Sequence, residues 1–416
     1  MKTLFKGFTV IDKSSEWNGK VVDILVVGQK IEKIAESLGN SDAKVIEGNS
    51  AFISVGWMDS FSFIGEPGLE HQETLETGLK SAAKGGFTKV LLTPNTSPCI
   101  QGKAEIEFLK SKSQSLPVAV LPMGALSQEL KGQELAEMYE MYQAGAVAFG
   151  DGRNALQHTG LMKRALMYVK KMNGIVVNVA NDDFLSEGGQ MHEGIWSAKL
   201  GMKGVPNLAE EVMANRDIEL AKYTKSKLHL AKISSGKTVE LLRKAKSEGH
   251  GVSASVASYQ LYLEDKDVAG YDSNYKVLPV LRSAEDRKAL IEGLKDGSID
   301  CICSNHEPRE EEVKKKEFNL AESGIVNYET SFALAYKALV DEMKLEDIVA
   351  LFTSGPRKVF GMEPQVIQEG AIADFTFFER KDWTFDKPVS FAKNTPFKGE
   401  KFSVKVKGTF CKGTLN

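Results

Sequence analysis

Phe52-Ile53-Ser54-Val55-Gly56-Trp57-Met58 is an almost uninterrupted apolar run, typical of a strand that is buried on both faces. Seven similar runs follow at residues 90–92, 118–123, 147–149, 175–179, 228–233, 252–256 and 299–303. Amphipathic stretches separate most of them, at residues 74–84, 208–223, 239–248 and 284–294 among others. Apolar runs that alternate with helical patterns indicate a parallel sheet covered by helices. Eight runs match the strand count of a (β/α)8 barrel.

An open, doubly wound sheet is the competing architecture, but no glycine-rich phosphate loop follows the first strand, so the barrel is favoured. The two ends of the chain have a different pattern. Short alternating strands separated by turns occupy the first fifty residues, and the same style returns in the last fifty. We therefore expect an α/β protein with a barrel at residues 51–365. Residues 1–50 and 366–416 would together form a small β-sandwich domain.

Charge and composition exclude several classes of protein. The chain has 53 basic and 56 acidic side chains and a net charge of -3, which gives no general attraction to nucleic acid or to an anionic membrane. No segment approaches the roughly 18 apolar residues of a membrane span, and residues 1–10 lack the apolar core of a signal peptide. Four cysteines are few for this length and indicate a reducing compartment. We expect a cytoplasmic protein.

A barrel predicts where chemistry should occur, because active-site residues lie just past the carboxyl ends of the strands. The corresponding positions are residues 59–63, 93–95, 150–151, 179–182, 232–234, 257–260 and 304–309.

Several motifs at these positions resemble one family. Residues 59–68, Asp-Ser-Phe-Ser-Phe-Ile-Gly-Glu-Pro-Gly, resemble the dihydroorotase segment D-x-H-x-H-x-R-E-P-G, and residues 93–98 resemble its M-P-N-T-x-P. Residues 279–282 resemble P-P-L-R, and residues 369–374 and 394–399 extend the match to the end of the chain. The sequence is thus similar to dihydroorotases of the cyclic-amidohydrolase family over its whole length. The resemblance implies a TIM barrel of the metal-dependent hydrolase type and a role in pyrimidine biosynthesis.

In that family a pair of zinc ions activates a hydroxide, and the resemblance assigns six metal-ligand positions. Five of them carry other residues here, namely Phe61, Phe63, Val179, Lys232 and Asn305, the last in place of the catalytic Asp. Asp151 alone keeps a side chain that can bind a metal. Phenylalanine and valine cannot coordinate zinc, and an ammonium group repels it. We predict that zinc binding is lost, that no other cofactor replaces it, and that these residues form a vestigial site with Asp59 and His306.

The residues that the resemblance assigns to substrate binding are also altered. Gly65 stands where the family has the arginine that binds the substrate carboxylate, and Leu278 stands where it has an asparagine. Asn95 matches the family's binding asparagine and is retained. Without the bidentate arginine, dihydroorotate should bind poorly.

Two interpretations of the altered site remain open. Asp59, Asp151, Lys232 and Asn305 should converge at the barrel mouth. Lys232 could be a nucleophile or base whose pKa is lowered by burial. Alternatively, it neutralises Asp59 or Asp151 while phenylalanines fill the vacated space, and this second interpretation is favoured. His306 is a further candidate for a functional role at the mouth.

The leading functional hypothesis is a catalytically inactive dihydroorotase homologue that acts as a structural or regulatory partner of aspartate transcarbamoylase. The alternative is an amidohydrolase that acts on dihydroorotate or another cyclic amide with an altered, metal-poor site. A ligand-sensing subunit is the third functional hypothesis, and the retained Asn95 is the only residue that supports it. The resemblance also implies a homodimer.

Overall fold

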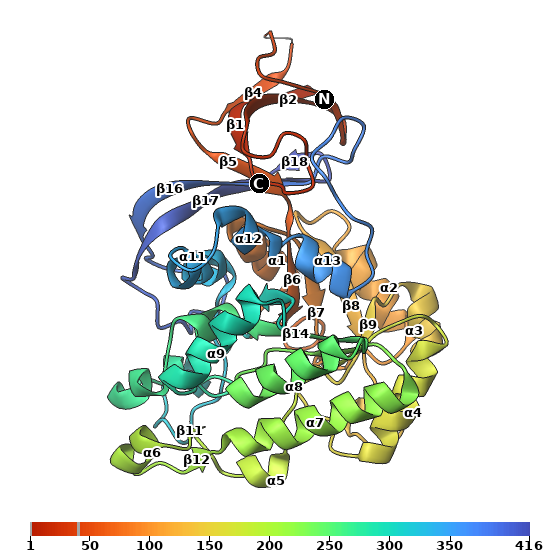
Figure 1. Ribbon diagram of the computed structural model, residues 1–416, viewed down its shortest axis with the longest axis vertical. Coiled ribbons are helices and arrows are strands. Elements are labelled where there is room, and N and C mark those ends of the chain that lie inside the picture. Colours follow the sequence, from red (N-terminus) through yellow and green to blue (C-terminus); the bar gives the residue numbers. More distant parts are fainter. Residues whose placement is uncertain (1, 40–41) are drawn as a thin grey trace.

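The computed structural model describes residues 2–39 and 42–416, and its centre is a barrel of parallel strands (Figure 1). The strand order is β15-β14-β13-β10-β9-β8-β7-β6, and β15 lies against β6 and closes the barrel. The strands are β6 (Trp57–Ser62), β7 (Phe87–Leu92), β8 (Ala119–Gly124), β9 (Ala148–Phe149), β10 (Val176–Asn178), β13 (Leu228–Leu230), β14 (Val252–Ala257) and β15 (Cys301–Cys303). The predicted (β/α)8 architecture is confirmed.

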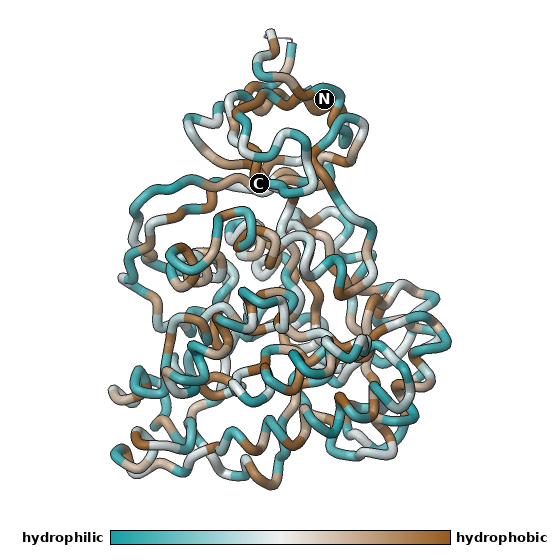
Figure 2. The backbone as a smooth tube through the Cα atoms, viewed as in Figure 1, coloured by the Kyte–Doolittle hydropathy of each residue, from teal (hydrophilic) through white to brown (hydrophobic). Residues whose placement is uncertain are grey.

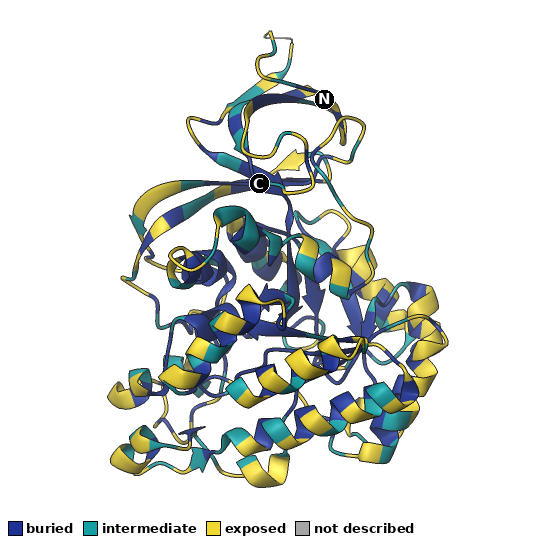
Figure 3. Cartoon of the chain, in the orientation of Figure 1, coloured by how far each residue is buried: buried dark blue, intermediate teal, exposed yellow. Residues whose placement is uncertain are grey.

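Helices surround the barrel, and the exposed parts of the chain lie mainly on their outer faces (Figure 3). The longer ones are α1 (Leu75–Lys84), α2 (Lys103–Lys112), α3 (Met138–Ala144), α4 (Thr159–Lys170), α7 (Asn207–Thr224), α8 (Gly236–Ser247), α9 (Ala284–Lys295) and α11 (Tyr328–Leu339). Side-chain caps start four of them, because Thr74, His158, Ser235 and Ser283 accept hydrogen bonds from the first-turn amides of α1, α4, α8 and α9.

Short elements occupy the loops between these helices. They are α5 (Asp183–Ser186), β11 (Met191–His192), α6 (Ile195–Leu200), β12 (Gly204–Val205), α10 (Glu311–Lys314), α12 (Leu345–Ala350) and α13 (Ser354–Val359), together with 3-10 turns. None of the helices in the described residues has the length and apolarity needed to span a membrane.

The apolar run at residues 52–58 forms two strands rather than the one expected. β5 (Phe52–Val55) pairs with β1 (Lys2–Val10) and β16 (Phe375–Thr384) in the terminal sheet, while β6 begins the barrel. Gly56 separates them, and a Cβ there would lie 2.2 Å from Thr88 Oγ1 and 2.3 Å from Asp374 Oδ1. Both strands are buried, so their apolar character could not reveal that they belong to different sheets.

The two ends of the chain come together in one small β domain, for which the sequence predicted a sandwich. Its strands form a single eight-stranded sheet in the order β18-β17-β16-β5-β1-β2-β3, with β4 paired to β1. The remaining strands are β2 (Val21–Val27), β3 (Lys30–Ala35), β4 (Lys44–Glu47), β17 (Lys401–Cys411) and β18 (Thr414–Leu415). Apolar stretches of the amino-terminal strands run through this sheet (Figure 2). Phe5 packs edge-on against Phe375 and Phe410, with ring centres 5.4 and 5.3 Å apart, and so joins the two termini.

Candidate functional site at the barrel mouth

Asp59 lies on β6 and is fully buried. Its Oδ1 accepts a hydrogen bond of 2.7 Å from the Ser304 backbone N–H, and its Oδ2 accepts one from the Ser304 hydroxyl. Burial raises the pKa of Asp59 to about 6, although these hydrogen bonds partly counteract the effect. The carboxylate therefore joins the first strand of the barrel to the loop after the last one.

Asp151 follows β9, and its carboxylate, like that of Asp59, accepts hydrogen bonds from a neighbouring loop. Its Oδ1 accepts hydrogen bonds from the backbone N–H groups of Leu126, at 3.0 Å, and Ser127, at 2.8 Å. Its Oδ2 accepts one from the Ser127 hydroxyl at 2.5 Å. Burial raises the pKa of this carboxyl group as well. Both carboxylates are thus occupied by serine residues of neighbouring loops.

Lys232 follows β13 and is 2% exposed. Its Nζ donates a hydrogen bond of 2.9 Å to the Leu278 carbonyl and lies 5.1 Å from the centre of the Phe61 ring. The expectation that Lys232 neutralises Asp59 or Asp151 is wrong, because neither pair occurs among the ion pairs of residues 2–39 and 42–416. The two carboxylates already have serine partners. Burial lowers the pKa of the lysine.

Asn305 binds to the same backbone carbonyl as Lys232. Its Nδ2 donates hydrogen bonds to the Leu278 carbonyl at 3.0 Å and to the Tyr259 hydroxyl at 2.6 Å. Asn305 and Tyr259 are both buried. Of the four residues expected to converge, Lys232 and Asn305 therefore meet at Leu278, while Asp59 and Asp151 each bond to a different loop.

A group of charged residues at the mouth was not anticipated from the sequence. Glu307 Oε1 accepts hydrogen bonds from Arg309 Nη2 at 2.5 Å and Arg153 Nη1 at 3.1 Å. Burial alone would raise the pKa of Glu307, but Arg309, Lys232 and Arg153 lower it to about 2. Both guanidinium groups also lie within 6 Å of the Phe63 ring centre, at 5.5 Å for Arg153 and 5.9 Å for Arg309.

Three cations therefore surround one carboxylate, where the family resemblance implies a metal centre. The sequence offered one indication that these charged residues lie at the barrel mouth. Arg153 lies two residues after Asp151, and Glu307 directly follows His306. Nothing in the local sequence indicates that these charges meet, because they come from the loops after β9 and β15.

His306 is fully buried and stacks on Tyr328, with ring centres 3.9 Å apart. Its Nδ1 accepts a hydrogen bond of 3.3 Å from the Asn327 backbone N–H, and its Nε2 lies 3.8 Å from Glu73 Oε2. Burial lowers the pKa of the imidazole, although Glu73 counteracts this. These contacts give His306 a packing role between the loop after β15 and the segment before α1.

Two of the positions that the resemblance assigns to substrate binding, Asn95 and Gly65, are tightly constrained by neighbouring backbone. Asn95 Nδ2 donates to the Asp151 carbonyl at 3.1 Å, and its Oδ1 accepts from the Arg153 backbone N–H at 3.1 Å. Both ends of this amide therefore hold the loop after β9. A Cβ on Gly65 would lie 2.1 Å from the Leu69 carbonyl oxygen, so the backbone has no room for a side chain there.

The donor atoms at the mouth do not fit a zinc centre. Within residues 2–39 and 42–416, no group of three or more His, Cys, Asp or Glu side chains is placed to hold a metal ion. Val179 is buried at the end of β10 and has no donor atom. The charge at the expected centre is a buried ammonium group, which disfavours a dication by Coulomb repulsion.

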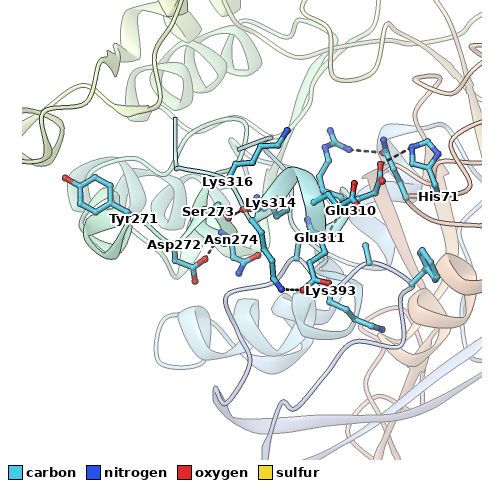
Figure 4. Close-up of a pocket in the computed structure, with 17 residues that line it drawn as sticks. His71, Tyr271, Asp272, Ser273, Asn274, Glu310, Glu311, Lys314, Lys316 and Lys393 are labelled. Carbon is cyan, nitrogen blue, oxygen red and sulfur yellow. Dashed lines mark hydrogen bonds and ion pairs between the residues drawn. The ribbon is translucent and has the colours of Figure 1, made fainter. Parts of the chain in front are cut away.

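A cavity of about 820 Å³ lies beside the mouth rather than within the vestigial site (Figure 4). Its walls come from His71 and Gln72, from residues 271–274, from α10 with its flanking residues, and from residues 391–394. Arg309 links the cavity to the mouth, because it lines the cavity and also contacts Phe63. The described residues of its wall do not include any of the predicted vestigial-site residues.

Comparison with known proteins first places the fold. The structure resembles L-hydantoinase (dihydropyrimidinase) from Arthrobacter aurescens with a TM-score of 0.88 and 24% identity, covering 99% of this chain and 95% of that one. A dihydropyrimidinase from Brevibacillus agri gives a TM-score of 0.84 with 20% identity, covering 100% and 95%. At this level of identity the likeness shows the fold alone, which is a (β/α)8 barrel with a sheet built from the two termini.

Sequence comparison then identifies the family. The family described as Dihydro-orotase-like matches residues 52–238. A dihydroorotase of Pelotomaculum thermopropionicum is 41% identical over 406 residues, which cover 96% of this chain and 94% of that protein. Another from Caldicellulosiruptor saccharolyticus is 37% identical, with coverages of 94% and 93%. The chain belongs to the dihydroorotase family, as the motifs indicated.

Proposed function

We propose that this chain is a catalytically inactive member of the dihydroorotase family. In this proposal it is a cytoplasmic protein of de novo pyrimidine biosynthesis that acts as a structural or regulatory partner of aspartate transcarbamoylase.

The observation that carries the proposal is the buried ammonium group of Lys232 against Phe61. Both residues stand at positions that the resemblance assigns to zinc ligands, and the cation and the ring now contact each other. A bound zinc ion would have to approach this ammonium group in a medium of low dielectric, where charge repulsion is strong. Asp59 and Asp151 could bind a zinc ion only if each lost the hydrogen bonds to its serine partner.

The retained barrel supports a role that depends on the surface of the molecule. The loops around the mouth are held together by new contacts, such as those of Glu307 with two arginines, rather than by metal ligands. A family scaffold can persist after its chemistry is lost, because fold and site are separable. The four free cysteines are compatible with the reducing cytoplasm.

Metal analysis and an activity assay test the proposed loss of catalysis. Purified protein should contain far less than one zinc ion per chain and should not interconvert carbamoyl aspartate and dihydroorotate, with or without added zinc. The matched control carries Phe61→His, Phe63→His, Val179→His, Lys232→His and Asn305→Asp together. Zinc uptake by this variant would show that the assay detects a restored centre. Zinc-dependent turnover by the unaltered chain would refute the proposal.

Co-purification tests the proposed partnership separately. The chain should elute together with the aspartate transcarbamoylase of the same organism at native expression levels. Independent elution of the two proteins would refute the partnership while leaving the proposed inactivity standing.

A second candidate function is favoured by one observation. Burial lowers the pKa of Lys232, and a neutral amine can act as a nucleophile or base on a cyclic amide without a metal. In that case Lys232→Met would abolish a measurable amidohydrolase activity while the protein remained folded. If no cyclic amide is hydrolysed by the unaltered chain, this second function is excluded.

A further inference from the structure

The cavity beside the mouth has different charges in the buried and the exposed parts of its wall (Figure 4). Arg309 and Lys314 are the buried charged residues of this wall as the structure describes it, and both are cations. The acidic residues of the wall are all exposed or half-buried, namely Asp272, Glu310, Glu311 and Glu312. The buried part of the wall therefore carries positive charge alone.

Lys314 is buried without a carboxylate partner. Its Nζ donates hydrogen bonds to the backbone carbonyls of Glu322, at 3.0 Å, and Gly324, at 3.1 Å. A third and longer hydrogen bond, of 3.4 Å, reaches the Lys276 carbonyl. No ion pair within residues 2–39 and 42–416 involves this ammonium group. Carbonyl dipoles solvate a cation but do not neutralise it, and an unpaired charge is costly to bury.

Lys276 is a second buried lysine of this kind, and its backbone carbonyl contacts Lys314. Its Nζ donates hydrogen bonds of 2.7 and 3.1 Å to the carbonyls of residues 318 and 319, and this side chain forms no ion pair in the described part of the chain. Glu307 is a buried carboxylate that acts on Lys314, but its Oε1 already accepts hydrogen bonds from two arginines. Two buried ammonium groups thus lack a counter-charge.

The exposed acidic residues of the wall do not compensate the buried lysines. Glu310 Oε1 lies 3.1 Å from His71 Nε2, and Glu311 forms an ion pair with Lys315. Solvent and salt also screen exposed charges much more strongly than buried ones. The positive charge inside the cavity therefore persists.

The size and lining of the cavity fit an organic molecule that supplies the counter-charge. A volume of about 820 Å³ exceeds what an inorganic ion needs and falls within the range of roughly 300–1,000 Å³ for small-molecule pockets. Tyr271 and Phe391 bring apolar surface to the outer part of the cavity, where they are 51% and 59% exposed. Lys316 and Lys393, also exposed in the wall, add positive charge. An anion with an apolar portion matches both features.

The cavity is distinct from the substrate positions of the family. Asn95, Gly65 and Leu278, to which the resemblance assigns substrate binding, do not belong to its described wall. Arg309 lies between the cavity and the mouth, and its Nη1 and Nη2 donate hydrogen bonds to Gln72 and Glu307. Lys314 rather than Arg309 is therefore the buried cation of the wall that still lacks a counter-charge.

We propose that this cavity binds a small organic anion, whose carboxylate or phosphate group provides the counter-charge for Lys314 and Lys276. The inference goes beyond the proposed function, because it involves neither the vestigial site nor any activity of the chain. An occupant would contact the loop after β15, which also carries Glu307 at the mouth.

Isothermal titration calorimetry of the full chain tests binding. Phenyl phosphate and benzoate are the probes for the two anionic groups, and benzamide is the uncharged counterpart of benzoate. At least one of the two anions should bind about 10-fold or more tightly than benzamide, because hydrogen bonds to charged groups are the stronger ones. The tighter anion identifies the group that the site prefers. If neither anion binds better than benzamide, the proposal is overturned.

Substitution of Lys314 tests which group holds the anion. Lys314→Met removes the buried ammonium group and keeps a side chain of similar length, so it should weaken binding of the tighter probe at least about 10-fold. Lys276→Met should cause a smaller loss, because Lys276 is not part of the described wall. The control is the exposed Lys288→Met on α9, which should leave the affinity unchanged. Circular dichroism verifies that each variant is folded. Equal affinities of Lys314→Met and the control would contradict the proposal.

Proton uptake provides a test that needs no variant. Burial and the neighbouring Arg309 lower the pKa of Lys314 to about 8. Lys276 acts in the same direction, whereas Glu307 and Asp272 oppose it. A bound anion favours the charged form and raises this pKa, so up to about half a proton should be taken up per bound anion at pH 8. Calorimetry at pH 8 in two buffers of different ionisation enthalpy measures the uptake. Binding without proton uptake would place the anion away from Lys314 and overturn the assignment.

Discussion

The Nζ atom of Lys232 lies 5.1 Å from the centre of the Phe61 ring and donates its hydrogen bond to the Leu278 carbonyl rather than to a carboxylate. A buried cation is thus stabilised by an aromatic face and a backbone dipole, whereas Asp59 and Asp151 bond to serines. The mouth of the barrel is held by many separate contacts, and each can be tested by a single substitution.

Lys232→Met should leave the free energy of unfolding at pH 7 unchanged or raise it. The Leu278 carbonyl keeps Asn305 as a donor, and an apolar chain of similar length replaces a buried charge. Urea unfolding would measure the effect. The exposed Lys288→Met is the control and should change stability by less than about 0.5 kcal/mol. A large loss of stability only in Lys232→Met would contradict this account.

Stability should also depend on pH through Lys232. Its pKa is lowered in the folded state by burial, so the unfolded chain binds more protons between the folded and unfolded pKa values. The contribution of this residue to stability therefore rises with pH up to the ordinary lysine pKa of about 10.4. The unaltered chain should gain stability relative to Lys232→Met between pH 7 and pH 10, as measured by urea unfolding across that range. If the difference in unfolding free energy between the two proteins does not change with pH, the lysine is not desolvated.

Asp59→Asn should make the protein less sensitive to pH in the acidic range. The pKa of Asp59 is raised to about 6, so the native state binds more protons than the unfolded chain between roughly pH 4 and 6. The unaltered chain should therefore lose on the order of 3 kcal/mol relative to Asp59→Asn as pH rises through that interval. Thermal unfolding at pH 4 and pH 7 tests this, with the exposed Asp341→Asn as control. If the stability of all three proteins changes equally between pH 4 and pH 7, the prediction is refuted.

Glu307→Gln should destabilise the barrel mouth strongly. It would remove the carboxylate on which Arg153, Arg309 and Lys232 converge, leaving buried positive charge uncompensated. Breaking such a buried arrangement costs about 3–5 kcal/mol. Urea unfolding at pH 7 measures the loss, and Glu312→Gln on the exposed side of α10 should have little effect. Because the pKa of Glu307 is lowered to about 2, its stabilising contribution should disappear as pH falls from about 4.5 toward 2. Equal stability of the two variants at pH 7 would contradict the prediction.

Gly65→Ala should cost about 1–3 kcal/mol, since the new methyl group would collide with the Leu69 carbonyl oxygen 2.1 Å away. Gly270→Ala is the matched control, because a Cβ there meets nothing within 4 Å. Differential scanning calorimetry of both variants decides the point. If Gly65→Ala is as stable as the control, the loop could accept the arginine that the family carries, and the present backbone would not exclude it.

The sequence by itself determined the architecture and the identity of the altered positions. The eight apolar runs predicted the barrel, because burial on both faces leaves a signal in adjacent residues. The motifs around Asp59 and Asn95 identified the family, and the replacements at Phe61 and Lys232 could be seen directly.

Only the tertiary structure decided which partners these residues have. Asp59 meets Ser304 across 245 positions of chain, and Arg153 meets Glu307 across 154. The first pairing arises when the barrel closes and brings the ends of its first and last strands together, and the second arises because the loops after β9 and β15 meet at the barrel mouth. No local pattern contains that information, because hydrogen bonding and charge pairing depend on distances that the folded chain sets, not on separation along the sequence. For the same reason, only the folded structure could show that Lys232 rests on Phe61 instead of on either carboxylate.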